Sequence, residues 1–336
     1  MEPVLKTYST PLAPPAVLSA CPICGEGMSG KIYYPREMMF GSRKQYRYIL
    51  CSQCGTLWCA DPVDPKEAYP EGYYSFALDR ETGGLKKSLH KILAKTRVLK
   101  PVSVLINRLR LMRAEPHLLP LFRQARVTRR SRILDVGCGA GALLIRLHDA
   151  GFASLAGIDP NISSDIDYPC GIKIRKQRIF DISENYDAII LNHVLEHVSN
   201  PIESLRHLRA HIDADGYIMA SVPLIDCYAF RKYMADFASI DAPRHIFVPS
   251  LSAMYKLAAD SGLRVEKVVY YSGRFQFAVS EAHAGDVATN ELSALKEPDG
   301  GTKKGNIKEY ASLDKFARHL NRTQDGDRAA FLMKRT

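Results

Sequence analysis

The sequence contains no apolar run approaching the ~20 residues that a helix needs to cross a bilayer, so no transmembrane helix is expected. Residues 1–20 have Glu2 near their start and prolines through their middle, in place of a basic stretch and an unbroken apolar one, so we expect no secretory signal. The eight cysteines do not form a disulfide framework, because four make two C-x-x-C pairs and the others are scattered. No internal repeat is visible. These absences predict a cytoplasmic protein in a reducing compartment.

Acidic side chains are nearly missing from residues 85–130. This segment contains thirteen Lys and Arg residues and one acidic residue, Glu115, so its net charge is +12. Since the net charge of the whole chain is +10, the remaining residues together carry −2. Leucine and isoleucine recur in it at helical spacing, which predicts basic amphipathic helices. One interpretation is a solvated helical lid on the sheet domain. The other is a docking surface for anionic lipid headgroups or a lipid-carried glycan phosphate, which would make the protein peripheral to a membrane.

The remaining composition is that of a globular protein, with 46% hydrophobic and 24% charged residues. Shifts in composition predict, in order, a flexible arm (1–20), a cysteine module (21–60), a Tyr- and Pro-rich linker with the basic helices (61–130), an α/β domain (131–280) and a polar, partly helical tail (281–336).

Short apolar runs alternate with helical patterns in the α/β domain. They predict strands at 132–136, 154–158, 172–174, 187–191, 216–222, 264–271 and 274–280. Helices are expected between several of these strands, at 140–150, 201–211 and 250–261. The pattern predicts a Rossmann-like, seven-stranded sheet that is mostly parallel, with the last two strands forming an antiparallel edge hairpin.

The paired cysteines are Cys21 with Cys24 and Cys51 with Cys54, and a glycine follows each pair. A C-x-x-C turn places two thiolates on one side of Zn²⁺, and two such turns close a tetrahedral site with no position left for water. The sequence therefore predicts a structural zinc site in a module of ~40 residues, which is too small to fold on its own core. Redox dithiols or incidental cysteines are the alternatives.

A glycine-rich turn follows the first strand of the α/β domain. Asp135 lies at the end of the strand, Gly137, Gly139 and Gly141 follow, and Asp159 ends the next strand. Such a turn lets backbone amides approach a ligand at a helix N-terminus. It also fits a relaxed dinucleotide fingerprint, but an NAD site would need only the second acid. A tight turn without a ligand is the remaining alternative.

The D-x-G-x-G-x-G run, together with Leu195-Glu196-His197-Val198 and Pro243-Arg244-His245, resembles the class I S-adenosylmethionine-dependent methyltransferases. With the paired cysteines ahead of it, the chain is similar to the zinc-ribbon-bearing group associated with bacterial surface-polysaccharide or modified-sugar pathways. The resemblance implies a methyltransferase sheet and a cytoplasmic, S-adenosylmethionine-dependent enzyme.

The resemblance also implies roles for single residues of the cofactor site. Asp135 and the three glycines would cradle the methionine part of S-adenosylmethionine, and Asp159 would hold the ribose. Only 27 residues separate Asp159 from Asp187, so the acid that meets the adenine is hard to place, and Asp181 is the nearest candidate.

Ligands of open α/β sheets bind beyond the carboxyl ends of the strands, where this sequence places Asn192 to His197 and the loop before residue 246. We expect Asn192 to line the cofactor site. Transfer of a methyl group to a hydroxyl or carbon acid needs a base, and histidine titrates in the right range. His245 is the first candidate, followed by His193 with Glu196 beside it. Arg244 is either an anion clamp or a surface charge.

The expected acceptor is a small molecule, a sugar or a glycan intermediate. An RNA methyltransferase is the main alternative, because basic helices and a zinc ribbon suit RNA. Nucleic acid is disfavoured, since Phe122 is the single aromatic residue between residues 85 and 130 and base stacking needs several. A third possibility is a protein that binds S-adenosylmethionine without catalysis.

Overall fold

The computed structural model describes residues 19–61, 63, 68, 111, 115–294 and 307–336, with the backbone alone for 293–294 and 307–310. Its main feature is an eight-stranded sheet with the strand order β11-β12-β9-β8-β4-β5-β7-β6. The strands are β4 (Arg132–Val136), β5 (Ser154–Ile158), β6 (Ile166–Asp167), β7 (Lys173–Arg175), β8 (Tyr186–Asn192), β9 (Ile212–Pro223), β11 (Leu263–Tyr270) and β12 (Arg328–Arg335).

The five strands from β7 to β9 in this order run parallel, and antiparallel strands lie outside them on both sides. The middle of β8 is buried without a break, as expected of a parallel strand with both faces covered. The mostly parallel α/β sheet predicted from the sequence is thus confirmed. All five parallel strands end at one edge of the sheet, which is where open α/β sheets bind ligands.

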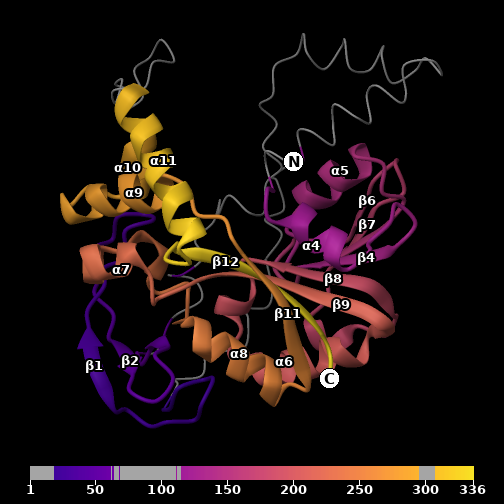
Figure 1. Ribbon diagram of the computed structural model, residues 1–336, viewed down its shortest axis with the longest axis horizontal. Helices are drawn as coiled ribbons and strands as arrows, with labels where there is room; N and C mark the ends of the chain where they lie inside the picture. Colours follow the sequence, from indigo (N-terminus) through magenta and orange to yellow (C-terminus); the bar gives the residue numbers. More distant parts are fainter. Residues whose placement is uncertain (1–18, 62, 64–67, 69–110, 112–114, 295–306) are drawn as a thin grey trace, which may run out of the picture.

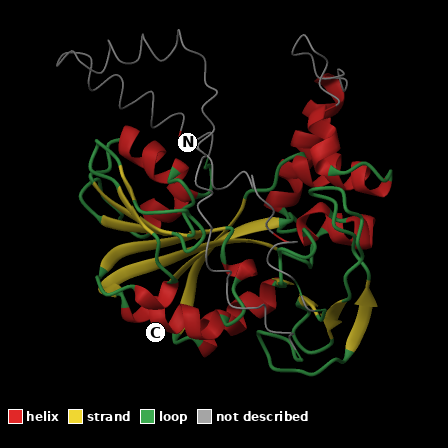
Figure 2. Ribbon diagram, turned by 180° about the vertical axis from the view of Figure 1, so that it is seen from behind, coloured by secondary structure: helices red, strands yellow, loops and turns green. Residues whose placement is uncertain are grey.

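Helices cover both faces of the sheet (Figures 1 and 2). They are α4 (Leu118–Gln124) and α5 (Ala142–Asp149) on one face, and α6 (Pro201–Ala210) and α8 (Leu251–Asp260) on the other. Alternate residues of a strand serve the two faces: Ile133 packs in the cluster that contains α5, and Leu134 in the cluster that contains α8. This two-sided burial fixes the register of the strands and therefore the positions of the residues at their ends.

The predicted edge hairpin was wrong. Residues 264–271 do form a strand, β11, but its partner is β12, and the expected second strand lies in the helix α9 (Phe275–Ala284). The prediction of a polar tail was also wrong for its last residues. They form β12, which pairs with β9 on one side and β11 on the other, and residues 329–333 are buried. The sheet therefore extends past the boundary expected at residue 280.

The N-terminal cysteine module, residues 21–60, forms a second, small sheet with the strand order β1-β2-β3-β10. Its strands are β1 (Gly30–Tyr33), β2 (Tyr48–Cys51), β3 (Leu57–Cys59) and β10 (Phe247–Val248). The last of these comes from the loop after β9, so the module and the main domain share a sheet. We call α9, α10 (Thr289–Ala294) and α11 (Ile307–Arg322) the helical insertion, because they lie between β11 and β12. It shares a buried cluster with the module and with α7 (Tyr228–Tyr233) (Figure 1).

Most of the basic segment, residues 85–110 and 112–114, lies outside the described residues, as do the arm at 1–18 and most of the linker. The end of the segment forms α4, which buries Leu118, Leu121 and Phe122 against the sheet and leaves Arg123 exposed. Among the helices of the described part, none combines the length and the apolar character that a membrane crossing requires.

Candidate functional site

The four paired cysteines converge in the folded module. One sulfur atom from each of Cys21, Cys24, Cys51 and Cys54 lies within 4.8 Å of all the others. The two C-x-x-C turns repeat one geometry, in which the following glycine donates its amide to the carbonyl of the first cysteine, at 2.9 Å for Gly25 and 3.0 Å for the second turn. Neither close pair is a disulfide, because the Sγ atoms of Cys21 and Cys54 are 3.5 Å apart and those of Cys24 and Cys51 are 3.4 Å apart.

The chemistry of this cluster suits a metal ion. The hydrogen bond from Cys21 lowers the pKa of the Cys54 thiol to about 5, whereas burial raises the pKa of Cys24 to about 11. The site therefore stabilises a thiolate at Cys54, while a further positive charge would favour the thiolate of Cys24. Four thiols in a closed, largely buried set are compatible with structural zinc, as the sequence predicted.

The glycine turn lies between β4 and α5, as expected. Gly137 has φ = +67°, and a Cβ there would lie 2.6 Å from Cγ2 of Val194, so both its conformation and its surroundings require glycine. Gly139 has φ = +52° and donates its amide to Oδ2 of Asp159 at 2.9 Å. The other carboxylate oxygen of Asp159 accepts the amide of Asn161 at 2.8 Å. This acid thus holds the turn in shape from the end of the neighbouring strand.

Asp135 is the most perturbed acid of the site. It is 3% exposed, and within the described part of the chain no hydrogen bond or ion pair reaches its carboxylate. Burial, with the charges of Glu115 and Asp159 nearby, raises the pKa of Asp135 to about 8. A buried carboxyl without a partner fits a ligand that brings a cationic group, and the amino group and sulfonium of S-adenosylmethionine are of this kind.

This perturbation predicts that S-adenosylmethionine affinity rises with pH between about pH 6 and 7.5, by up to tenfold per unit. Below its raised pKa Asp135 is protonated, so binding a cation there releases a proton. Because the pKa of Asp135 is higher in the folded protein than in the unfolded chain, its ionisation lowers the stability of the unliganded protein as the pH rises toward 8. Calorimetry in buffers of different ionisation enthalpy measures the release, and Asp135→Asn is expected to abolish it. Equal proton release in both proteins would contradict the assignment.

Two further predicted cofactor residues lie apart from this acid pair. Asp181 ends a 3₁₀ turn (η2, Ile179–Asp181) and pairs with Arg178 at the surface, and no contact among the described residues joins it to Asp135 or Asp159. Its contact with adenine stays a prediction. Asn192 ends β8 at the ligand-binding edge, and its buried side-chain oxygen has no hydrogen-bond partner.

The sequence analysis missed His117, which precedes α4. It is 1% exposed, neither of its ring nitrogens has a hydrogen-bond partner, and its ring stacks on Tyr271 at 4.1 Å. Burial lowers the pKa of His117 to about 3, so the ring is neutral. Its Nε2 lies 4.0 Å from Oε2 of Glu115, and the nearby side chain of Asn192 partly offsets the lowering of its pKa, so His117 lies beside Asn192 at the ligand-binding edge.

The candidate histidines gather around one carboxylate. Glu196 is completely buried, and its Oε1 lies 3.0 Å from Nδ1 of His193 and 3.8 Å from Nε2 of His245. Burial opposes ionisation of Glu196, but the imidazoles around it hold its pKa below the ordinary value. The hydroxyl of Tyr271 lies 2.8 Å from Nε2 of His193, a contact that no motif in the sequence predicts.

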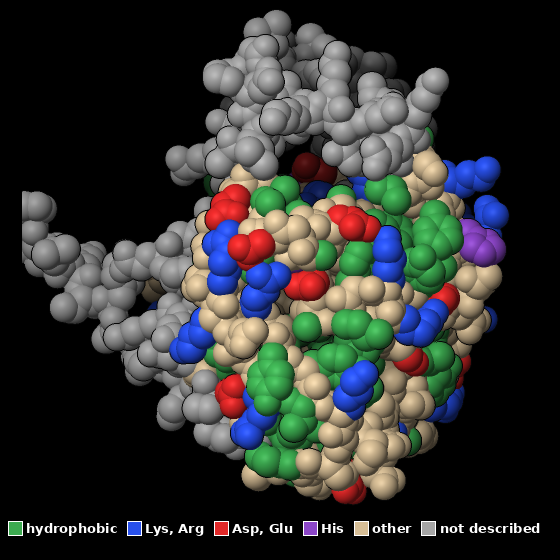
Figure 3. All heavy atoms as spheres, turned by 90° about the vertical axis from the view of Figure 1, so that its left-hand side faces the viewer, with side chains coloured by type: hydrophobic (Ala, Val, Ile, Leu, Met, Phe, Trp, Pro, Cys, Tyr) green, Lys and Arg blue, Asp and Glu red, His purple; other side chains and the backbone are tan. Residues whose placement is uncertain are grey.

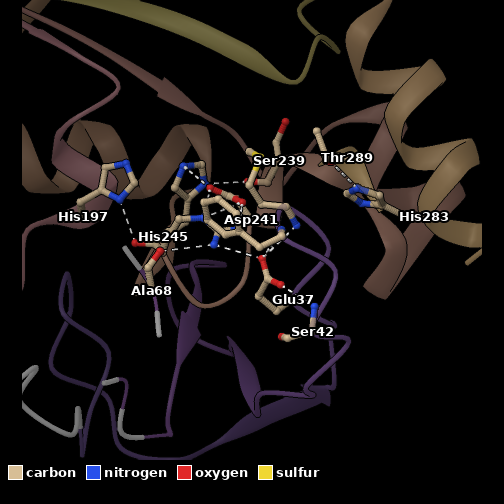
Figure 4. Close-up of polar contacts among 12 residues, drawn as sticks. Glu37, Ser42, Ala68, His197, Ser239, Asp241, His245, His283 and Thr289 are labelled. Carbon is tan, nitrogen blue, oxygen red and sulfur yellow. Dashed lines mark hydrogen bonds and ion pairs between the residues drawn. The ribbon is translucent and has the colours of Figure 1, made fainter. Parts of the chain in front are cut away.

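His245 lies in the loop between β9 and β10, and its hydrogen bonds define its tautomer. Its Nδ1 lies 2.9 Å from the carbonyl of Ser239, which can only accept, so Nδ1 carries the proton and Nε2 the lone pair. Its Nε2 lies 3.8 Å from Oε1 of Glu196 and 3.9 Å from Oδ2 of Asp241. Figure 4 shows the ring beside Asp241 and Ser239. An imidazole held by one nitrogen, with the other beside a carboxylate, is arranged to exchange a proton.

His197 packs against this base. Its ring meets that of His245 at 4.8 Å, and its Nδ1 donates to the carbonyl of Arg244 at 2.8 Å. Burial lowers the pKa of His197 to about 4. A metal ion could also be held by three side chains here, because the ligand atoms of Glu196, His197 and His245 lie within 4.8 Å of one another. Two of these three ligands are nitrogens, so the set does not suit magnesium, which prefers oxygen ligands.

Neither interpretation of Arg244 was right. Its side chain is fully buried and forms ion pairs with Asp241, at 2.5 Å, and with Glu37 of the cysteine module, at 3.1 Å. It is therefore neither exposed nor available to clamp a substrate anion. On the face of the molecule shown in Figure 3, acidic and basic side chains lie side by side.

Comparisons with known proteins find similarity to methyltransferases. Residues 104–268 match the family model described as "Methyltransferase domain". The tRNA U34 carboxymethyltransferase of Campylobacter jejuni is 24% identical over 147 residues, which are 41% of this chain and 50% of that protein. The ubiquinone biosynthesis O-methyltransferase of Rickettsia canadensis is 27% identical over 150 residues, 40% of this chain and 64% of that protein. The tRNA U34 carboxymethyltransferase of Campylobacter hominis is 25% identical over 105 residues, 28% of this chain and 37% of that protein.

The chain thus spans less than two thirds of the length of these curated relatives. Among solved structures, it is similar to coclaurine N-methyltransferase bound to N-methylheliamine and SAH, with a TM-score of 0.41 and 16% identity over 65% of this chain and 69% of that one. A putative sarcosine dimethylglycine methyltransferase from Galdieria sulphuraria gives a TM-score of 0.42 and 14% identity over 66% and 85%.

Proposed function

We propose that this protein, whose residues 104–268 match the methyltransferase family model, is an S-adenosylmethionine-dependent methyltransferase that transfers a methyl group to a hydroxyl group of a small acceptor. The observation that carries the proposal is the fully buried Glu196 between His193 and His245, at the edge of the sheet where the glycine turn also lies. The proposed proton acceptor and the proposed cofactor cradle would thus lie at one end of the same strands.

The cofactor side of the site consists of Asp135, the glycine turn and Asp159. The backbone of Gly137 to Gly141 takes the methionine part, with the Asp135 carboxylate on its cationic groups. Asp159 takes the ribose hydroxyls with the oxygen lone pairs that Gly139 and Asn161 leave unused. The orphaned oxygen of Asn192 is a further acceptor on this side.

The acceptor side supplies the base. S-adenosylmethionine contributes a methyl group on a positively charged sulfur, and the C–S bonding pair stays on sulfur as the acceptor oxygen takes the methyl group. Nε2 of His245 removes the hydroxyl proton, and Glu196 stabilises the imidazolium that results. His193 holds Glu196 through its Nδ1 and meets Tyr271 with its other nitrogen. Alignment of the two reactants provides the remainder of the rate enhancement.

The acceptor is proposed to be a sugar or a glycan intermediate. Enclosure of the base supports a slender acceptor, since the side chain of His245 is 12% exposed and that of Glu196 is not exposed at all. An RNA acceptor is the second candidate, because the relatives from Campylobacter are named tRNA U34 carboxymethyltransferases. The mixed charge of the face in Figure 3 does not favour a large polyanion.

The cysteine cluster is proposed to hold structural Zn²⁺ with Cys21, Cys24, Cys51 and Cys54 as its four ligands. A closed set of four thiolates gives the ion no open position for a substrate. Its role is therefore to fold the module rather than to take part in methyl transfer.

Replacing His245 with alanine is expected to reduce methyl transfer by about 100-fold or more while S-adenosylmethionine affinity stays within twofold, because the histidine removes a proton and does not touch the cofactor. A one-methyl mass shift across sugar nucleotides, lipid-linked glycans and tRNA identifies the acceptor and gives the rate. His148→Ala, at a half-buried position of α5 away from the acceptor side, is the matched control.

Unchanged turnover in His245→Ala would exclude this histidine as the base. Cofactor binding without a mass shift on any acceptor of the panel would favour the non-catalytic interpretation. A shift on tRNA alone would establish the RNA candidate.

A further inference from the structure

The buried ion pair of Arg244 connects two regions that are far apart in the sequence. Its guanidinium lies between Asp241, in its own loop, and Glu37, in the cysteine module, and it stacks over the ring of Phe40 at 5.2 Å. Glu37 and Arg244 are 4% and 0% exposed at their side chains. An ion pair so deep is costly to break from one side, because the remaining charge stays buried without its partner.

Glu37 is itself held rigidly by the module. Its two carboxylate oxygens accept the backbone amides of Met39, Phe40 and Ser42 at 2.9–3.0 Å. Burial opposes its ionisation, but these amides and the guanidinium of Arg244 keep the pKa of Glu37 below its ordinary value. The carboxylate is therefore a fixed negative charge that the module presents to the loop (Figure 4).

The module also holds the backbone on both sides of His245. The hydroxyl of Tyr48 donates to the carbonyl of His245 at 2.8 Å, and the amide of Cys59 donates to the carbonyl of Ile246 at 2.8 Å. The amide of Ile246 in turn donates to the carbonyl of Glu196 at 2.9 Å. The strand β10 starts one residue later and pairs with β3 of the module. The backbone next to His245 is thus hydrogen-bonded to that of Glu196, beside the residues through which the module binds the loop.

We propose that Glu37 and Tyr48 of the cysteine module are positioning residues for the acceptor site, and that the module serves to hold His245 in its proton-accepting orientation. Glu37 acts through Arg244, which fixes Asp241 and the turn that carries the histidine. Tyr48 acts directly on the backbone. This inference rests on the proposed function for its catalytic meaning, but the placement of His245 can be measured without any acceptor.

The same module offers a matched control. Arg43 also reaches the main domain, but through exposed ion pairs with Asp286 and Glu291 at the helical insertion. These pairs attach the module without touching the loop of His245. If the module acts only as an attached body, loss of Arg43 and loss of Glu37 should have similar consequences.

The test compares Glu37→Gln, Tyr48→Phe and Arg43→Gln with the wild-type protein by ¹⁵N NMR of the histidine rings and by hydrogen exchange. We expect the wild-type His245 to carry its proton on Nδ1, as its bond to Ser239 requires, and Arg43→Gln to keep that signature. Glu37→Gln should give a mixture of tautomers and make exchange of the Ile246 amide roughly tenfold to a hundredfold faster. Tyr48→Phe should produce a smaller change in the same direction.

Binding of S-adenosylhomocysteine and the zinc content are measured on each variant and should stay at the wild-type values, which shows that the sheet and the cysteine cluster remain folded. Once an acceptor is known, Glu37→Gln should lower kcat with little change in the KM for S-adenosylmethionine. An unchanged His245 tautomer and unchanged Ile246 exchange in both Glu37→Gln and Tyr48→Phe would overturn the inference. Failure of the wild-type protein to bind S-adenosylhomocysteine would instead overturn the proposed function and leave the His245 measurements standing.

Discussion

Replacing Asp159 with alanine is expected to weaken S-adenosylmethionine binding by about 100-fold or more. Hydrogen bonds to a charged acceptor contribute roughly 1.5–3 kcal/mol each, and the ribose would supply two of them. The substitution also removes the acceptor of the Gly139 and Asn161 amides, which now hold the glycine turn at 2.9 and 2.8 Å. The turn therefore loses its shape together with its ribose contact. Isothermal calorimetry with S-adenosylmethionine and S-adenosylhomocysteine measures the loss.

Two further variants separate these effects. Asp159→Asn keeps the size of the side chain and one carbonyl oxygen, so we expect a loss of about tenfold, between that of alanine and no change. Asp167→Ala removes an exposed aspartate two strands away, in β6, where it pairs with Arg175, and should bind like the wild type. Wild-type affinity in Asp159→Ala would show that the ribose lies elsewhere and would leave the turn as a purely structural feature.

The cofactor side of the site could be predicted because its signals are local. Asp135 and the glycine turn follow one another in the sequence, and their strand was predicted with its observed bounds. The alternation of short apolar runs with helices predicted the parallel strands for the same reason, since each crossover is a continuous segment.

The edge of the sheet could not be predicted in this way. Residues 274–280 contain apolar side chains too few in number to distinguish a strand from a helix by their period, and the packing against the module and α11 favours the helix α9. The true partner of β11 follows more than fifty residues later, after the helical insertion. A pattern read along the chain contains no signal for such a pairing.

The acceptor side depends on contacts between distant residues. Arg244 and Glu37 are 207 positions apart, and each alone looks like an ordinary surface charge. The motif around His245 marked the loop as a candidate, but the tautomer, the buried Glu196 and the contact with Tyr48 appear only in three dimensions. The cysteines were recognised by their spacing, whereas what they hold in place was not.

This division has a consequence for stability. The cofactor side rests on the main sheet, whereas the loop of His245 is paired with β3 of a module whose own core is small. The module is joined to the main domain at α8 as well, because the hydroxyl of Ser250 donates to the carbonyl of Cys54 at 2.6 Å. We therefore expect disruption of the cysteine cluster to affect the loop and the start of α8 most directly, because the hydrogen bonds of the module go to these two segments.

Loss of the metal from the cysteine cluster is expected to unfold the module. Structural zinc contributes about 10–16 kcal/mol to the folding of small zinc modules, which exceeds what a core of this size supplies. Trp58 is the single tryptophan of the chain and is completely buried in β3, in the core cluster that the module shares with the main sheet, so its fluorescence reports on the packing of the module against the main domain. Chelation of the purified protein, or the substitution Cys51→Ser, should shift its emission to longer wavelength and reduce the zinc content from about one per chain to none.

Loss of the metal should affect the cofactor side and the acceptor side of the site differently. S-adenosylhomocysteine binding should persist, because Asp135 and Asp159 stand on strands of the main sheet, whereas methyl transfer should fall as far as in His245→Ala. Cys170→Ser is the matched control, since Cys170 is an exposed cysteine outside the cluster and should change neither zinc content nor emission. A wild-type protein without zinc, or a Cys51→Ser variant with buried Trp58 and full turnover, would contradict this account. Parallel loss of both halves would mean that the module supports the whole domain and not the acceptor side alone.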